Sequence, residues 1–304
     1  MNETIFNLLL GHIAMLAFSL LVSLSFVLGV IVADAINPIA ITGARLLLAA
    51  LILLIFMSLT NSLLTSRNWH LFKNPKNYAF LSILISVYFI TMFEGLKTSS
   101  AISMSAVFTL TPLLTGVFSH LLAYQLLTRK VFFAVVVGAI GSLWVIFQGS
   151  LENVLEMNIG TGELIFFVGC IAHSLYAVYI PILNRGESSL VQTFGVLTIS
   201  SIFVCILGIK PISETDWLNL PMIAIFAILY LAIFATAITF FLIQFSAQRI
   251  KGVKVMSYTY AVPFWVSLAS GLILNTWPSI QTLCGGVLIG MALYLLLQDD
   301  IKSN

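Results

Sequence analysis

The sequence predicts an all-α integral membrane protein, with ten transmembrane helices arranged as two inverted five-helix repeats. Three observations lead to this prediction: the composition, the spacing of long apolar stretches, and the placement of basic residues between them. Of the 304 residues, 60% are apolar and 8% are charged, and the mean hydropathy is +1.10. A soluble domain carries about 25% charged residues, so this chain has too few to cover a water-facing surface.

Ten apolar stretches follow one another along the chain, each about as long as a helix needs to cross a hydrocarbon core of ~30 Å. They cover residues 9–32, 38–59, 78–96, 100–122, 131–147, 162–183, 189–209, 221–245, 253–274 and 279–297. The strict alternation that membrane strands require is absent, so helices are predicted throughout. The first stretch lacks a preceding basic region and is expected to be retained as a helix, not cleaved as a signal peptide.

Basic residues alternate between the two sides that these helices define. With the N-terminus in the cytoplasm, the outer loops contain two, Lys97 and Lys210, and Arg45 lies within a helix. The remaining ten fall on the cytoplasmic side: Arg67, Lys73, Lys76, Arg129, Lys130, Arg185, Arg249, Lys251, Lys254 and Lys302. Because Lys and Arg are enriched in cytoplasmic loops, both termini are predicted to be cytoplasmic.

A polar segment, residues 148–161, divides the chain into a first repeat at 1–149 and a second at 150–304. Five helices is an odd number, so the second repeat must lie upside down relative to the first. Corresponding features support the division: Pro112 and Pro263 lie about ten residues into their spans. The fifth and tenth helices carry glycine pairs, Gly138 and Gly141 in one and Gly286 and Gly290 in the other.

Inverted repeats place a substrate site near the bilayer midplane, where the halves meet. A proline inside a helix leaves the carbonyl one turn earlier without its partner, which here would be near Phe108 and Thr259. Pro112 and Pro263 are therefore predicted to kink their helices beside the site. The alternative is that they bend helices for packing alone.

Charged groups within a span cost about 2.5–3.5 kcal/mol on insertion scales, so those present are informative. Arg45 lies seven residues past Pro38, and Glu94 lies two residues before the outer end of its span. Because their depth is similar, we expect an Arg45–Glu94 ion pair, or a shared polar site, near the outer mouth. The alternatives are that the Arg45 side chain extends to the membrane–water interface and that Glu94 is exposed to water at the outer surface.

His173 lies eleven residues into the sixth span, close to the midplane. A neutral histidine at that depth can hydrogen-bond a substrate or relay a proton, or it can be a packed core residue. Other substrate-binding candidates are small polar or aromatic side chains near the two prolines and in the sixth span. They are Ser105, Thr109, Tyr176, Tyr258, Tyr260 and Trp265.

Several classes of activity are not supported by the sequence. No nucleotide-binding loop, basic cluster or metal-spaced set of ligands is visible, so neither cofactor, metal nor nucleic acid is predicted. A membrane-embedded enzyme would need converging carboxylates or a serine–histidine pair. A channel would show rings of charge or a filter loop. Both remain remote alternatives to a carrier of small molecules.

The motifs resemble the EamA family of the drug/metabolite transporter superfamily. The first half is similar through NPIAITGARLLLAAL (37–51) and GLKTSSAISMSAVFTLTPLL (95–114), and the second through GELIFFVGCIAHSLYAVY (162–179) and the stretch FATAITFF to YTYAVPF (234–264). The chain departs from the family pattern at four places. Val22 and Ser23 replace a Trp-Gly pair, Gln125 and Thr276 each replace a glutamate, and His173 replaces a tryptophan.

The resemblance implies a secondary active transporter in the bacterial cytoplasmic (inner) membrane, working by alternating access on a small organic solute. Amino-acid or metabolite efflux is the favoured expectation. The alternative is uptake or exchange of a nucleoside-like or sulfonium metabolite. The expected partners are the lipid bilayer and the solute, and the driving gradient is expected to be that of the solute itself or of protons.

Overall fold

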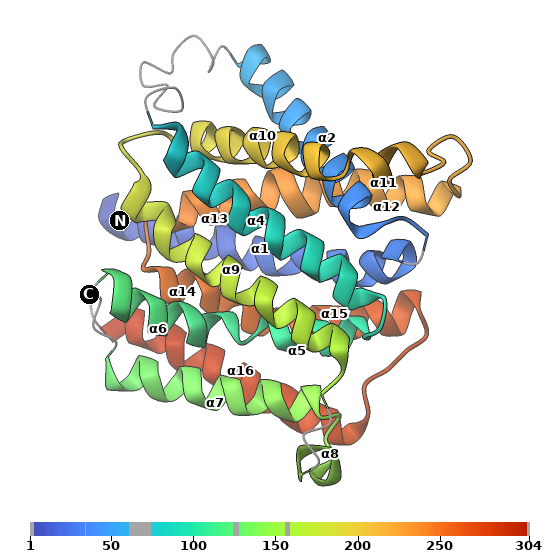
Figure 1. Ribbon diagram of the computed structural model, residues 1–304. Helices are drawn as coiled ribbons and strands as arrows, with labels where there is room; N and C mark the ends of the chain where they lie inside the picture. The colour runs from blue at the N-terminus through green and yellow to red at the C-terminus, as the bar shows by residue number, and fades with distance from the viewer. Residues whose placement is uncertain (1–2, 34, 61–73, 124–127, 156–158, 303–304) are drawn as a thin grey trace.

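The computed structural model describes residues 3–33, 35–60, 74–123, 128–155 and 159–302. Within these ranges every regular element is a helix (Figure 1). The predicted cytoplasmic residues Arg67 and Lys73, and Gln125 of the family comparison, lie outside the described residues. The all-α prediction is confirmed.

The first half contains α1 (Glu3–Ala33), α2 (Pro38–Leu59), α4 (Pro75–Leu96), α5 (Ala101–Phe108), α6 (Thr111–Ala123) and α7 (Arg129–Ile146). The second half begins with α8 (Leu151–Leu155), α9 (Thr161–Leu183), α10 (Ser189–Leu207) and α11 (Ile209–Glu214). It continues with α12 (Met222–Ala232), η1 (Ile233–Ile238), α13 (Thr239–Ala247), α14 (Gly252–Ser257), η2 (Tyr258–Ala261), α15 (Val262–Ile273) and α16 (Ile280–Lys302).

Eight helical segments in the described part of the chain are long and apolar enough to cross a membrane. They correspond to the first eight predicted spans, with α5 and α6 forming one and α12 to α13 another. The ninth predicted span is broken into α14, η2 and α15, and the tenth is α16. Large apolar side chains are exposed on the outside of the bundle, among them Phe133, Ile206, Phe226 and Leu272. Such a surface is stable in lipid and not in water.

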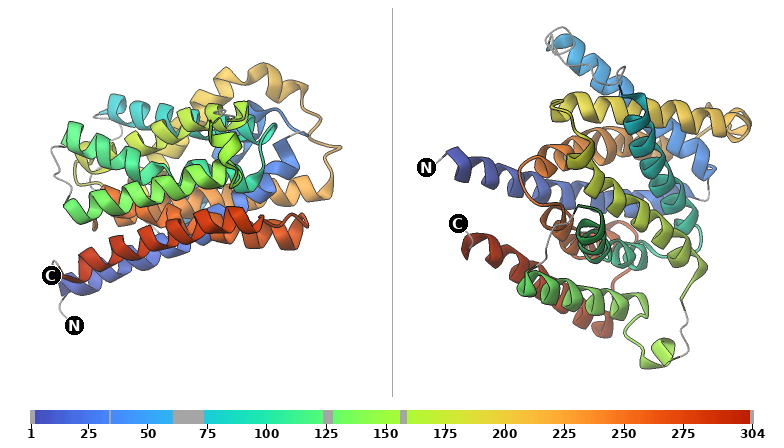
Figure 2. Two further views of the ribbon diagram at one scale, coloured as in Figure 1. Left: turned by 90° about the horizontal axis from the view of Figure 1, so that it is seen from below. Right: turned by 60° about the vertical axis from the view of Figure 1, so that its left-hand side comes forward.

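The two halves pack with a common pattern. The first helix of each half packs against the third span of the other, since α9 lies along α4 and α1 lies along α13. The second helices, α2 and α10, pack against each other, as do the last helices, α7 and α16 (Figures 1 and 2). This exchange of partners is what two related five-helix units produce. The start of α1 and the end of α16 lie at the same end of the bundle (Figure 1).

The chain changes direction or helical form at both predicted prolines. Before Pro112, α5 ends at Phe108 and α6 begins at Thr111. The Thr111 hydroxyl donates to the Phe108 carbonyl at 2.7 Å, which satisfies the group that the proline leaves without an amide partner. Before Pro263, the tight helical turn η2 separates α14 from α15. A hydrogen bond of 3.2 Å between the Thr111 and Thr259 hydroxyls joins the two breaks across the halves.

A third interruption was not predicted from the sequence. The eighth span widens into a π-helical turn, η1, between α12 and α13. Residues 233–238 contain neither proline nor glycine, so the sequence carries no helix-breaking residue here. Such turns shift the carbonyls of a helix out of register and are frequent at functional sites.

Candidate functional site

Arg45 is fully buried in α2 and contacts the π-helical turn η1 of the other half. Its Nε donates to the Thr236 hydroxyl at 2.9 Å, and its Nη2 donates to the Ala235 carbonyl at 3.0 Å. The guanidinium lies over the Phe89 ring at 3.9 Å from the centroid, an arrangement that favours a cation. The alternative interpretation required Arg45 to extend to the membrane–water interface. Its complete burial shows that it does not.

The expected Arg45–Glu94 ion pair is wrong. Glu94 lies at the partly exposed end of α4, where its Oε2 accepts from the Lys97 Nζ at 3.0 Å. Arg45 instead donates to the backbone carbonyl of Ala235, because the widened helix of η1 directs that carbonyl toward α2. Similar depth along two helices was not enough to bring the two charges together.

We expect Glu94→Gln to leave thermal stability, and the transport that the family resemblance implies, unchanged, because an exposed ion pair contributes about 0–1 kcal/mol. Purified wild type and variant would be compared for melting temperature in detergent and for solute exchange in liposomes. A large loss of exchange in Glu94→Gln would restore a functional role for this carboxylate.

His173 lies halfway along α9 within a group of aromatic rings, and 1% of it is exposed. Its ring centroid is 4.5 Å from that of Tyr88 and 5.3 Å from that of Phe108. Tyr176 and Phe240 complete its surroundings, at 6.3 and 6.5 Å. The rings come from both halves, so His173 lies where the repeats meet.

Tyr176, one turn after His173, accepts a hydrogen bond of 2.8 Å from the Gln244 side chain of α13. Gln244 is fully buried and was not among the predicted residues. Phe240 lies one turn earlier on the same helix and packs against both Tyr176 and Phe89. A continuous line of side chains thus leads from Arg45 through Phe89 and Phe240 to Tyr176 and Gln244.

Four buried polar atoms in this group have no hydrogen-bond partner among the residues that the structure describes. They are Arg45 Nη1, Tyr88 OH, His173 Nδ1 and Gln244 Oε1. Two come from the first half and two from the second. A buried polar group without a partner costs about 1–3 kcal/mol, and each case in a native fold calls for an explanation such as a ligand or an unobserved water. We call the side chains of these four residues, with Tyr176, the central polar cluster.

Ser105 and Thr109 do not join the central polar cluster. The Ser105 hydroxyl donates to the Ile102 carbonyl of its own helix at 2.7 Å. The Thr109 hydroxyl donates to the Ala106 carbonyl at 2.6 Å and also contacts the Ser142 hydroxyl of α7. The hydroxyls of both residues are hydrogen-bonded locally, which fits a role in close helix packing.

The aromatic residues near Pro263 also lie apart from the central polar cluster. Tyr258 bonds His12 through its hydroxyl at 2.9 Å, and Tyr260 donates to the Val135 carbonyl at 3.2 Å. Trp265 is half-buried and packs edge-to-face on Phe264. The turn η2 directs the two tyrosines toward α1 and α7, so proximity to the proline in sequence did not place them with His173.

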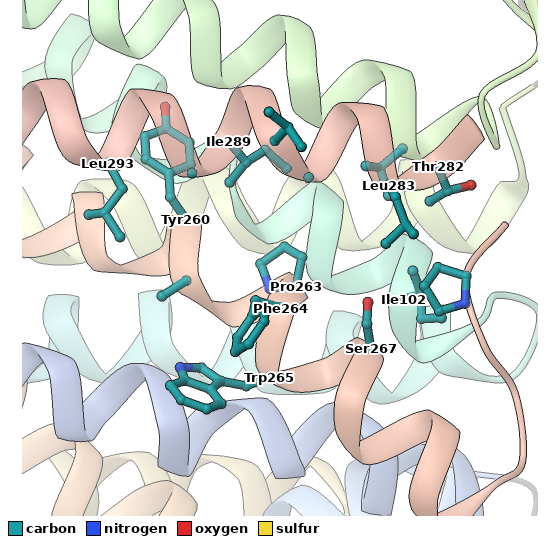
Figure 3. Close-up of a pocket in the computed structure, with 16 residues that line it drawn as sticks. Ile102, Tyr260, Pro263, Phe264, Trp265, Ser267, Thr282, Leu283, Ile289 and Leu293 are labelled. Carbon is teal, nitrogen blue, oxygen red and sulfur yellow. The ribbon is translucent and has the colours of Figure 1, made fainter. Parts of the chain in front are cut away.

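Tyr260 and Trp265 instead line a groove of about 590 Å³ with side chains of α15 and α16 (Figure 3). The other side chains that face it are mostly apolar, including Phe264, Ile289 and Leu293. None of the central polar cluster contacts this groove. Its chemistry matches the exposed apolar surface of the bundle, not a site for a polar solute.

Polar contacts tie the two halves together at opposite ends of the α4–α9 pair. At one end, the Glu163 carboxylate accepts from the Ser99 and Ser103 hydroxyls at 2.7 and 2.6 Å. At the other, the Tyr78 hydroxyl donates to Glu187 at 3.2 Å. No group of three potential metal ligands occurs among the residues that the structure describes.

The sequence could have indicated Tyr88 and Gln244, because each is a polar side chain well inside an apolar span. Phe89 and Phe240 carried no comparable signal, since aromatic residues are common throughout this chain. Their importance depends on the helices that face them.

Comparisons with known proteins agree with this architecture. Residues 9–147 and 160–298 each match the EamA-like transporter family. The chain is 26% identical over 282 residues to a Bacillus subtilis (strain 168) protein described as "Uncharacterized transporter YyaM", covering 91% of this chain and 90% of that protein. A solved structure described as "Crystal structure of protein" superposes with a TM-score of 0.68 over 95% of both chains, at 18% identity, which shows the fold alone.

Two matching units therefore account for most of the chain, in agreement with the helical pattern and the exchange of packing partners. The chain belongs to the EamA-like transporter family and is a multi-pass membrane transporter.

Proposed function

We propose that this transporter is a secondary carrier that moves a small organic solute by alternating access, with the central polar cluster as its binding site. The observation that carries the proposal is the set of four buried polar atoms without partners, contributed by both halves and surrounded by aromatic rings. Carriers built from inverted repeats bind their substrates at such an interface. A solute there would satisfy groups that the fold leaves without hydrogen bonds.

Alternating access requires the halves to separate at one end at a time. The contacts of Glu163 with Ser99 and Ser103, and of Tyr78 with Glu187, are the ones to break and reform at the two ends. Hydrogen bonds between membrane helices contribute about 0.6 kcal/mol on average, so these contacts are weak enough to exchange with solvent.

The finer assignment is efflux of an amino acid or similar metabolite across the bacterial cytoplasmic membrane, with both termini in the cytoplasm. The ten-to-two distribution of basic residues supports that orientation. Uptake or exchange of a nucleoside-like or sulfonium metabolite is the second candidate, and protons are the candidate driving ion. The division into repeats 1–149 and 150–304 is part of the same proposal.

We expect His173→Leu to slow solute exchange about ten-fold, because a lost buried hydrogen bond of about 1.4 kcal/mol changes an equilibrium by that factor. The measurement is counterflow of a labelled amino-acid mixture into liposomes containing the purified carrier, with and without a pH gradient. His120→Leu is the matched control, because His120 lies exposed at the end of α6. Equal rates in all three proteins would contradict the proposed site, and absence of counterflow in the wild type would contradict the carrier function.

A further inference from the structure

Arg45 is a buried cation without an anionic partner. No carboxylate among the described residues lies within ion-pair distance of it. Its guanidinium contacts Phe89 and, in η1, Thr236 and Ala235. Buried charges in proteins are normally paired or neutralised, because an uncompensated one is costly in a low dielectric. A positive charge is therefore available where the two halves meet.

The geometry leaves one edge of this guanidinium unused. Nε and Nη2 are occupied by Thr236 and Ala235, whereas Nη1 has no partner. The Tyr88 hydroxyl is a second buried donor without a partner among the described residues, and the Tyr88 ring lies 5.0 Å from that of Phe89, the ring under the guanidinium. A charged donor and a hydroxyl donor together suit the two oxygens of a carboxylate, because hydrogen bonds to ionised groups are the strongest that side chains make.

Aromatic rings adjoin these two donors. Phe89 lies directly under the guanidinium, Phe93 lies 5.5 Å from it, and the Tyr88 ring packs against His173 at a tilt of 36°. Apolar walls with a few convergent polar groups are typical of sites for small organic ligands. The body of the ligand is thus expected to be apolar or aromatic.

Aromatic rings alone could also bind a cation. The charge of Arg45 therefore decides between a cationic and an anionic ligand. A second positive charge about 5 Å from the guanidinium would be repelled by about 3 kcal/mol at an effective dielectric constant near 20. No acidic side chain among the described members of the cluster opposes that repulsion. A cationic solute is disfavoured, and an anionic group is favoured.

We infer that the solute carries a carboxylate, which Arg45 Nη1 and the Tyr88 hydroxyl bind, and an apolar or aromatic body, which lies along Phe89 and His173. This inference rests on the proposed function, because it assigns a substrate class to the same site. It excludes amines and sulfonium cations that lack a carboxylate.

Three probes with one body and different charges test the inference: 3-phenylpropionate, 3-phenylpropanamide and 3-phenylpropylamine, with phenylalanine as a zwitterionic carboxylate. A ligand that binds the folded state raises its melting temperature as concentration increases. We expect both carboxylates to raise the melting temperature of the purified carrier and the amide and amine not to do so. Equal or greater stabilisation by the amide or amine, or none by either carboxylate, would overturn the inference.

Variants of two tyrosines, one inside the central polar cluster and one outside it, provide the matched comparison. Tyr88→Phe removes the unpartnered hydroxyl and keeps the ring, and we expect the apparent Kd for 3-phenylpropionate to rise about ten-fold. Tyr294→Phe removes a hydroxyl from an exposed side chain of α16, outside the central polar cluster, and we expect no change in Kd. An unchanged Kd in Tyr88→Phe would remove this hydroxyl from the site.

Different results would contradict the carrier proposal and the carboxylate inference. If liposomes exchange the amine and the exchange is lost in Tyr88→Phe, the carrier site is retained and the carboxylate inference is wrong. If the carboxylates stabilise the protein and no solute exchanges, the binding inference is retained and the transport proposal is wrong.

Discussion

A chain carrying Gly141→Ala is expected to melt at a markedly lower temperature than the wild type, because the last helices of the two halves touch at this residue. A Cβ on Gly141 would lie 2.8 Å from the Gly285 carbonyl oxygen, and a Cβ on Gly285 would lie 2.7 Å from the Gly141 carbonyl oxygen. Both neighbours are backbone atoms and cannot move aside. Overpacking of this kind costs about 1–3 kcal/mol, and Gly285→Ala should act alike.

The glycines next to this contact provide a control of opposite sign. Gly286 and Gly290, which the sequence comparison paired with Gly138 and Gly141, have no heavy atom near the position of an added Cβ. Alanine is favoured over glycine in a helix by up to about 1 kcal/mol, so Gly286→Ala should be neutral or stabilising. Thermal unfolding in detergent, followed by tryptophan fluorescence, would compare the variants. Equal melting temperatures for Gly141→Ala and Gly286→Ala would contradict the close contact of α7 and α16.

Arg45→Met is expected to reduce solute exchange about 10- to 100-fold, in line with the about 1.5–3 kcal/mol of a hydrogen bond to a charged group. Its effect on stability should be much smaller, because two contributions oppose each other. The Ala235 carbonyl loses its donor from Arg45, at about 1–3 kcal/mol, whereas removing a cation from within the membrane relieves about 2.5–3.5 kcal/mol. Exchange and melting temperature would be measured on the same preparations.

Arg249→Met is the matched control for Arg45→Met. Arg249 also lies over a phenylalanine ring, Phe245, at 3.5 Å, and also donates to a carbonyl, but it follows α13 in the turn before α14. We expect its replacement to leave exchange unchanged. If Arg45→Met retained full exchange and melted far below the wild type, Arg45 would be a structural residue and not part of the binding site.

Much of the fold could be predicted from apolar run length and from the two prolines. Hydrophobic stretches of about 20 residues must be helical in a bilayer, because no water is present to satisfy free backbone groups. The breaks before Pro112 and Pro263 follow from the missing proline amide. The π-helical turn at 233–238 has no such residue and could not be predicted, and the donor to its Ala235 carbonyl, Arg45, comes from another helix.

The candidate site was predicted in part. His173 and Arg45 were identified because polar groups within a span are expensive and therefore rare. Their neighbours were assigned less well. Tyr176 lies next to His173, but Tyr258 and Tyr260 bond to other helices, Trp265 packs on Phe264, and Glu94 pairs with Lys97.

The sequence by itself determined that the chain is a helical membrane protein of two similar units, because length, apolarity and the position of basic residues depend on the bilayer and not on packing. Only the tertiary structure decided which polar groups share an environment. Depth along a helix is a one-dimensional quantity, whereas contact also requires the rotation of each helix and the identity of its neighbour. That rotation brings Tyr88 against His173 and turns Arg45 from Glu94 toward the carbonyls of the π-helical turn.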